Sequence, residues 1–498
     1  MQFTSYAFIL LFLPLFVLGY FLLNKINKFL GKLLIIAAGV VFYFFAGMES
    51  FSGSGALDTR NQRLSLLVFA GSIGMNVVFS LLMAKSKKRK KPLLAAAVIL
   101  DVAVLLLFKY RNFAIETVNG ILGTGIRPKE ILLPLAISFF TFQQIMYVVS
   151  VYRGEVESVN VIDYLAYILY FPKLLMGPLI EPSDLISQLN DPSLKKFRWE
   201  NLAAGMKIFS LGMFKKIVLA DTFARVVTWG FRQRDYLTAG DVLLFMLCYT
   251  FEIYFDFSGY SDMAVGASKM VNITLPINFD SPYKALSIRD FWKRWHISLT
   301  RFLTKYVYIP LGGSRKGKVR TCLNIMIVFL VSGLWHGADW IYILWGALHG
   351  LLMVLDRIFS KPERRDRNIG VKWFGTFLAV NFLWLLFRSM ALIQYKEFLE
   401  RIFCFRDMGI TEGMLQSFVL PEAALIFDTF GLNGLNSVVR GLSAVVFLVA
   451  SFLLCMIPEN NYRKLDKISF GSMLLSAAAF IWAFLCLSSE SVFVYFNF

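Results

Sequence analysis

Long blocks of apolar residues, separated by short polar or basic segments, run along nearly the whole chain. The first four blocks cover residues 8–23, 33–47, 64–84 and 93–108. A helix that crosses a bilayer needs about 20 mostly apolar residues, and these blocks reach or approach that length once their flanks are included. Length and hydropathy indicate about eleven to thirteen hydrophobic segments, some of them too short to cross fully. The pattern predicts an all-α protein that passes through a membrane many times.

The blocks change in character along the chain. Residues 1–111 and 371–498 form plain apolar spans with short loops, whereas residues 112–358 carry more polar and charged residues inside their apolar blocks. Prolines and a lysine interrupt FPKLLMGPLIEPSD, and YIPLGGSRKGKVR joins a proline, two glycines and a basic run. Irregular backbone at membrane depth is tolerated only where protein buries it or a wet cavity passes it. The middle region is therefore expected to hold re-entrant or interfacial pieces, within one membrane domain that covers residues 1–498.

Basic residues set the expected orientation. The formal net charge is +18, and cytoplasmic loops of membrane proteins gather lysine and arginine, so no nucleic-acid partner is needed to explain it. The run KSKKRKK at 85–91 is expected in the cytoplasm, as is KINKFLGK two spans earlier, which places the amino terminus outside. The basic loops SRKGKVR and KPERRDR are likewise separated by two apolar segments and are expected on the cytoplasmic side.

Several kinds of chemistry find no matching pattern. The five cysteines have no CxxC spacing, and no HxxxH or HExxH pair occurs, so no metal site is predicted. The chain also lacks GxSxG, and Cys322 has no base nearby in the sequence. This favours direct transfer assisted by a base over a covalent acyl-enzyme.

Histidine is rare, yet it concentrates in one apolar stretch. Only three histidines occur in 498 residues, and two of them, His336 and His349, lie in LWHGADWIYILWGALHG. The apolar segment before His336 is expected over 322–335, about 21 Å of helix against about 30 Å of hydrocarbon, which places His336 inside the membrane. Gly333 and Gly337 flank it and would let backbone or ligand approach closely.

An ionisable side chain at that depth is a functional candidate by default. Histidine exchanges a proton near neutral pH, and a dry cavity would keep His336 in the neutral form that a general base needs. The alternative is a structural histidine bonded to a helix carbonyl. His349 lies thirteen residues further on and is interpreted as a packing residue.

A second stretch combines basic and aromatic residues. SIRDFWKRWHISLTRFLTKYVYIPLGG covers 287–313 and carries five basic residues, two tryptophans and His296. As one helix it would place Arg289, Lys293 and His296 on one face. Such a helix is typical of a membrane interface, and its surface at the cytoplasmic mouth is a candidate site for a phosphate-bearing donor.

A third stretch holds carboxylates in an apolar block. YTFEIYFDFSGYSDMAVGASKM at 249–270 contains Glu252, Asp256 and Asp262. Buried carboxylates need partners, and we expect Ser258, Tyr260 or a basic residue of 287–313 to supply them. A structural ion pair and a catalytic role are both compatible with this pattern. Asp101 stands alone in its apolar block and is interpreted as structural.

With these residues in view, the chain resembles the membrane-bound O-acyltransferase family, and most of all the bacterial branch that includes the alginate O-acetyltransferases. The similarity spans nearly the whole chain and is densest from about 130 to 350. It rests on the stretches LPLAISFFTFQQIMYVVSVYRG, YFPKLLMGPLIEPSD, MFKKIVLAD, IYFDFSGYSDMAVG, NFDSPYKALSIRDFWKRWHISLTRFLTKYVYIPLGGSRKG and LVSGLWHGADWIYILWGALHG.

The resemblance implies a ring-like or horseshoe bundle of helices around a central tunnel, in a bacterial cytoplasmic membrane. It implies that His336 is the catalytic base, that His296 is the second motif histidine, and that no cofactor is held. An acyl thioester, acetyl-CoA or a carrier-protein thioester, would be the donor substrate. The residues expected to bind substrate are Trp335, Asp339, Arg294, Trp295, Asp256, Ser258, Tyr260 and Asn324.

The activity implied is transfer of an acyl group, with acetyl favoured, to a hydroxyl of an extracytoplasmic polysaccharide or to a partner transferase. D-alanyl transfer from a carrier protein to teichoic acid is a rival within the family. A transporter or flippase would also use broken helices and intramembrane charges, but it gives no reason for RWHISL together with LWHG. A structural assembly subunit is a further alternative, in which His336 could be replaced without loss.

Overall fold

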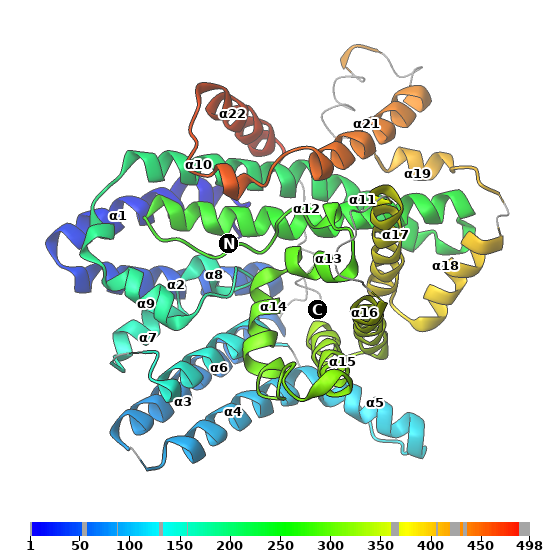
Figure 1. The fold of residues 1–498 in the computed structure, drawn as a ribbon. Coiled ribbons are helices and arrows are strands. Elements are labelled where there is room, and N and C mark those ends of the chain that lie inside the picture. The colour runs from blue at the N-terminus through cyan, green and yellow to red at the C-terminus, as the bar shows by residue number, and fades with distance from the viewer. Residues whose placement is uncertain are drawn as a thin grey trace. The chain divides into compact units, whose positions relative to one another are not determined.

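The computed structural model describes residues 2–51, 57–86, 88–128, 133–156, 158–359, 368–404, 407–418, 429–431 and 436–487. The basic loop at 361–367, which is expected on the cytoplasmic side, and residues 488–498 lie outside the described residues. Within the described part the secondary structure is entirely helical (Figure 1). The all-α prediction is therefore confirmed.

The chain divides into two compact units. The first comprises 1–209, 261–276 and 466–473, and the second comprises 210–260, 277–465 and 474–498. The long helix α12 (Ala239–Met270) contributes to both, because the division falls between Tyr260 and Ser261.

The first unit is built from most of the amino-terminal helices. These are α1 (Leu13–Ile26), α2 (Lys28–Phe51), α3 (Leu57–Lys85), α4 (Lys90–Leu105), α5 (Arg111–Leu122), α6 (Ile137–Arg153), α7 (Val161–Ile168), α8 (Phe171–Leu174), α9 (Pro182–Asn190) and most of α10 (Trp199–Met213). In its core the Asn76 amide donates to Asp101 Oδ1 at 2.8 Å, so Asp101 has a structural partner that its sequence surroundings did not reveal.

The second unit carries the remaining helices. These are α11 (Asp221–Arg232), α13 (Ile288–Arg294), α14 (Ile297–Leu303), α15 (Gly317–His336), α16 (Trp340–Phe359), α17 (Ile369–Arg388), α18 (Leu392–Cys404), α19 (Glu412–Gln416), α21 (Asn436–Met456) and most of α22 (Phe470–Leu485). All three histidines belong to this unit.

Eight helices among the described residues are long and apolar enough to cross a membrane, and α21 and α22 contain shorter apolar segments. The sequence count of about eleven to thirteen also included short pieces. The middle region supplies such pieces as α7, α8, α9, α13 and α14, each of nine residues or fewer. The protein is thus a multi-pass membrane protein whose middle region is broken into short helices.

The hairpin of α15 and α16 positions the histidine segment (Figure 1). Gly333 lies directly against the Tyr342 carbonyl, and Gly346 lies directly against the Phe329 carbonyl, so that a Cβ at either glycine would clash with backbone. Because glycine has no Cβ, the two helices approach until their backbones touch. The expected close approach at Gly333 is confirmed.

Candidate active site

His336 is the last residue of α15, and its side chain is enclosed by aromatic rings. It is 4% exposed, and the ring centroids of Trp335, Trp345 and Phe387 lie 4.8, 5.1 and 5.2 Å from its own. The chain leaves the helix in extended conformation at Gly337. The imidazole therefore sits at a helix end, in surroundings from which most water is excluded.

The predicted length of this segment was wrong. The helix begins at Gly317 rather than near residue 322, and its 20 residues span about 30 Å, the thickness of the hydrocarbon core. Its first turn carries Lys318 and Arg320. Because these charged residues lower the hydropathy of the turn, the apolar pattern predicted a helix that begins too late. His336 is shielded from water by its burial among aromatic rings, and not by a short helix that ends at mid-membrane.

His296 interrupts the stretch that the sequence predicted as one helix. Its backbone is left-handed, with φ 44° and ψ 53°, and it separates α13 from α14. The shared face of Arg289, Lys293 and His296 therefore does not exist. A non-glycine residue in this conformation costs about 1–3 kcal/mol and persists only where its surroundings enforce it.

The ring of His296 is buried beside the other site residues. Its centroid lies 4.7 Å from that of Phe257 and 6.1 Å from that of Trp335. In the described part of the chain, neither ring nitrogen bonds to another residue. Burial lowers the pKa of His296 to about 3, so the ring is neutral at physiological pH.

His349 is fully buried and held by an indole. Trp292 Nε1 donates a hydrogen bond to His349 Nδ1 over 3.2 Å. The ring of His349 also lies 4.7 Å from that of Trp345, which in turn contacts His336.

The three histidines thus belong to one connected set of rings, which we call the histidine–tryptophan cluster. Trp384 of α17 stacks on Trp345 at 6.0 Å and lies 4.8 Å from Trp295. The cluster consists of His296, His336, His349, Trp292, Trp295, Trp335, Trp345 and Trp384. Of the residues expected to bind substrate, Trp335 and Trp295 lie within it.

Three other expected residues have partners elsewhere. Arg294 Nε lies 2.9 Å from Asp290 Oδ1. The exposed Asp339 accepts a hydrogen bond from the Ile341 amide at 2.9 Å, at the start of α16. Asn324 donates to the Gly313 carbonyl at 2.8 Å and so holds the glycine-rich loop before α15. Within the described residues, none of these contacts joins the three side chains to the cluster, and their substrate-binding roles stay predictions.

Asp256 takes part in a buried charge cluster that the sequence did not predict correctly. Lys216 Nζ lies 2.8 Å from Asp256 Oδ1 and 2.7 Å from Asp221 Oδ1. The partner comes from the stretch MFKKIVLAD, not from 287–313 as expected. Although burial lowers the pKa of Lys216, the two carboxylates outweigh burial and raise it above its usual value, so the amine is charged.

The two hydroxyls expected beside Asp256 are both buried. Ser258 Oγ has no hydrogen-bond partner in the described part of the chain, so it is not the partner of Asp256 that the sequence suggested. Tyr260 is 6% exposed. Phe257, the next residue after Asp256, packs on His296 and links this segment of α12 to the cluster.

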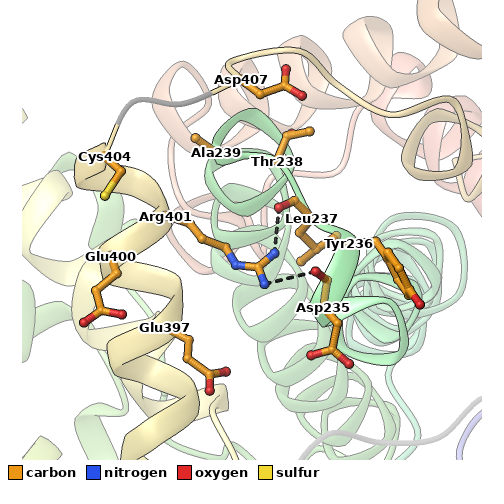
Figure 2. A pocket seen from close by; sticks show the side chains of 10 residues that line it. All are labelled: Asp235, Tyr236, Leu237, Thr238, Ala239, Glu397, Glu400, Arg401, Cys404 and Asp407. Atoms are coloured by element: carbon orange, nitrogen blue, oxygen red, sulfur yellow. Dashed lines mark hydrogen bonds between the residues drawn. The ribbon is translucent and has the colours of Figure 1, made fainter.

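A separate cavity of about 600 Å³ lies elsewhere in the second unit (Figure 2). Arg401 spans it and donates to the carbonyls of Leu237 and Asp235 at 2.7 and 3.2 Å. The lining residues are Asp235, Tyr236, Leu237, Thr238, Ala239, Glu397, Glu400, Arg401, Cys404 and Asp407. None of the residues singled out from the sequence lines this cavity.

Residues 98–392 match the sequence profile of the membrane-bound O-acyltransferase family, and this range contains the whole histidine–tryptophan cluster. The chain belongs to the membrane-bound O-acyltransferase family. The resemblance seen in its motifs is confirmed, and the chain is accordingly an O-acyltransferase.

Relatives of this acyltransferase extend over its full length. It is 34% identical to the peptidoglycan O-acetyltransferase of Helicobacter pylori, with 100% of the chain and 97% of the relative covered. It is 36% identical to a probable alginate O-acetylase of Pseudomonas putida, over 87% of the chain and 88% of the relative. A teichoic acid D-alanyltransferase of Bacillus subtilis is 26% identical over 51% of the chain and 66% of the relative.

Proposed function

We propose that this protein transfers an acetyl group from a cytoplasmic thioester to a hydroxyl of an extracytoplasmic glycan, or to a partner transferase that acts on one, with His336 as general base. The observation that carries the proposal is the enclosure of His336 by Trp335, Trp345 and Phe387 at the end of α15. A base in such a place meets a substrate hydroxyl without competition from bulk water.

In the proposed reaction, His336 accepts one proton and passes it on. The acceptor oxygen bonds to the acyl carbon, the thioester C–S bond breaks, and the hydroxyl proton passes to His336 and then to the departing thiolate. General-base catalysis of this kind contributes about 10²- to 10⁴-fold to a rate.

His296 is proposed as the second histidine of the site. Its neutral ring and its two nitrogens, which bond to no other residue in the described part, leave it able to bind a substrate oxygen or hydroxyl. Trp335 contacts both histidines, with its ring centroid 4.8 Å from that of His336 and 6.1 Å from that of His296. Trp335 would therefore set their spacing.

The orientation proposed follows the basic loops. Lys316, Lys318 and Arg320 at the start of α15 support a cytoplasmic location for that end under the positive-inside rule, and His336 would then lie toward the outer side. The same rule places the amino terminus outside. The donor would enter from the cytoplasm of a bacterial cell, and the glycan from the opposite side.

D-alanyl transfer to teichoic acid is the second candidate. It has the support of relatives such as the teichoic acid D-alanyltransferase of Streptococcus thermophilus, which is 28% identical over 54% of the chain. Acetyl transfer is favoured because the relatives named as O-acetyltransferase and alginate O-acetylase match with higher identity and over most of their own length.

The test replaces His336 by Ala and by Gln in the native host, with Trp340→Phe as a control at an exposed position of the same hairpin. Membrane levels are checked by immunoblot, and mild alkali then releases ester-linked acyl groups from the surface polymers. Loss of the ester at unchanged protein level supports the proposal, and the released acid distinguishes acetate from D-alanine. Persistence of the ester in both variants would make His336 a packing residue and contradict the proposal.

A further inference from the structure

Besides the two ring nitrogens of His296, three nitrogen atoms of the histidine–tryptophan cluster around His349 are buried without a hydrogen-bond partner in the described part of the chain. They are Trp345 Nε1, Trp384 Nε1 and His349 Nε2. Each of the three side chains is at most 1% exposed. Buried polar atoms are nearly always hydrogen-bonded in folded proteins, so a group of unsatisfied ones calls for a partner from outside the chain.

The hydrogen bond between Trp292 and His349 determines which nitrogen of the His349 ring carries the proton. An indole N–H can only donate, so Nδ1 of His349 must be the acceptor in the 3.2 Å contact with Trp292 Nε1. In the neutral ring the proton is then on Nε2. All three unsatisfied atoms are therefore N–H donors.

The three rings that carry these donors lie close together, and one of them contacts the proposed base. Ring centroids are 4.7 Å apart for Trp345 and His349, 6.0 Å for Trp345 and Trp384, and 6.4 Å for His349 and Trp384. The ring of Trp345 is 5.1 Å from that of His336. A ligand that meets these donors must present hydrogen-bond acceptors and reach the vicinity of His336.

The position along α16 indicates which substrate this is. The helix begins four residues after His336, and His349 lies about two and a half turns beyond Trp340 on the way to its other end. Near that end Asp356 accepts a hydrogen bond from the Arg289 amide of the basic helix α13. In the orientation proposed above, His349 lies on the cytoplasmic side of His336, where the acyl thioester enters.

We propose that His349, Trp345 and Trp384 bind the carbonyl oxygens of the pantetheine arm that carries the acyl thioester. This inference rests on the proposed function. The arm is a slender chain with two amide carbonyls besides the thioester carbonyl, and it is common to coenzyme A and to carrier proteins. The arm supplies hydrogen-bond acceptors and carries no charge. This suits a buried site made of aromatic rings and N–H donors, where a charged group would be costly to bury.

Two substitutions of His349 separate this role from a structural one. His349→Asn places an oxygen near the position of Nδ1, so it can keep the contact with Trp292 while it loses the Nε2 donor. His349→Gln places an amide N–H near the position of Nε2 and loses the acceptor for Trp292. A structural histidine tolerates Asn better than Gln, whereas the proposed substrate-binding histidine tolerates Gln better than Asn.

The measurement uses the full-length protein in lipid nanodiscs and a non-transferable analogue of the donor. S-(2-oxopropyl)-coenzyme A keeps the arm and a ketone in place of the thioester, and the same group on a carrier protein gives the second probe. We expect His349→Asn and Trp384→Phe each to weaken binding of one probe about three- to tenfold, the effect of one lost hydrogen bond. His349→Gln should stay within about twofold of the wild type, and Trp340→Phe should bind as the wild type does.

The outcomes distinguish the inference from the proposed function. If the wild type binds a probe but His349→Asn and Trp384→Phe bind it equally well, these residues do not bind the pantetheine arm and the inference is wrong. The proposal that an acyl thioester is the substrate would still hold. If the wild type binds neither probe, both the proposal of a thioester substrate and the inference about its pantetheine arm are wrong. Thermal unfolding of each variant identifies misfolded protein, and Trp345→Phe then replaces any variant that does not fold. The probe that binds more tightly identifies coenzyme A or a carrier protein as the source of the arm.

Discussion

Two buried polar clusters of the second unit differ in how their partners are supplied. Around Lys216 the protein provides both signs of charge, since the ammonium lies within 2.8 Å of Asp221 and Asp256. In the histidine–tryptophan cluster the donors of His349, Trp345 and Trp384 have no protein acceptor in the described part. A cluster whose charges pair with one another is expected to serve stability, and one whose hydrogen-bond donors lack acceptors is expected to serve a ligand. Changes in the two clusters should therefore appear in different measurements.

The largest expected effect on turnover comes from His336. We expect His336→Gln to lower the rate of acyl transfer about 10²- to 10⁴-fold, because the general base is removed. The thermal midpoint of the purified protein should change little, since the aromatic enclosure remains. A rate assay and an unfolding curve on the same preparation check both points. If His336→Gln instead lost much stability and kept its specific rate, the histidine–tryptophan cluster would serve stability, as the Lys216 cluster does.

The opposite pattern is expected for Lys216. Lys216→Met leaves the carboxylates of Asp221 and Asp256 buried without their cation, and breaking a buried pair in this way costs about 3–5 kcal/mol. The variant should unfold at a lower temperature and accumulate to lower levels in membranes. Asp221→Asn and Asp256→Asn added to Lys216→Met remove the uncompensated charges and should restore part of the stability. A fully stable Lys216→Met protein would contradict this assignment.

Gly333 tests whether the hairpin holds the site in place. Gly333→Ala places a Cβ against the Tyr342 carbonyl, and overpacking of this kind costs about 1–3 kcal/mol. The end of α15 should shift, so that both the thermal midpoint and the rate of transfer fall. Gly375→Ala on α17 is the matched control, because nothing lies within 4 Å of its added methyl group. Equal behaviour of the two variants would show that the close approach is not required.

The effect that is smallest at neutral pH is the pH dependence expected from His296. Burial lowers its pKa from 6.5 to about 3 in the folded protein, so the unfolded chain binds the extra proton between these values. Stability from this residue is complete above pH 6.5 and is lost as the pH falls toward 3, with a slope of at most about 1.4 kcal/mol per pH unit. Denaturation at several pH values should show a weaker slope for His296→Phe than for the wild type. Identical slopes would mean that His296 is not buried as described.

Hydropathy and motif composition predicted the helical class, the membrane location and the family, because these depend on patterns that are local in sequence. The break at His296 was missed, since nothing in RWHISL requires a left-handed residue. The contacts around it come from other parts of the chain, with Phe257 and Trp335 packed on the ring and the Ile297 amide donating to the Asn278 carbonyl. The partner of Asp256 was assigned to the wrong segment for the same kind of reason. Lys216 is 40 residues away in the chain, although a lysine within the apolar MFKKIVLAD was a signal that a buried anion was near.

The unsatisfied donors could not be predicted at all. The sequence shows that Trp345 and His349 are one helical turn apart, but whether an indole nitrogen meets a protein oxygen depends on the whole environment of the ring. Trp373, for example, donates to the Tyr283 carbonyl at 2.9 Å, whereas Trp384, eleven residues later on the same helix, finds no acceptor in the described part.

The glycine contacts between α15 and α16 have a consequence for how such enzymes can diverge. The two helices meet through the backbone at Gly333 and Gly346. The position of His336 relative to α16 therefore does not depend on the size of any side chain at that contact. The residues that surround the substrates can then vary from one lineage to another without displacing the base. A hairpin of this kind lets natural selection change what is modified while the chemistry of the modification is inherited intact.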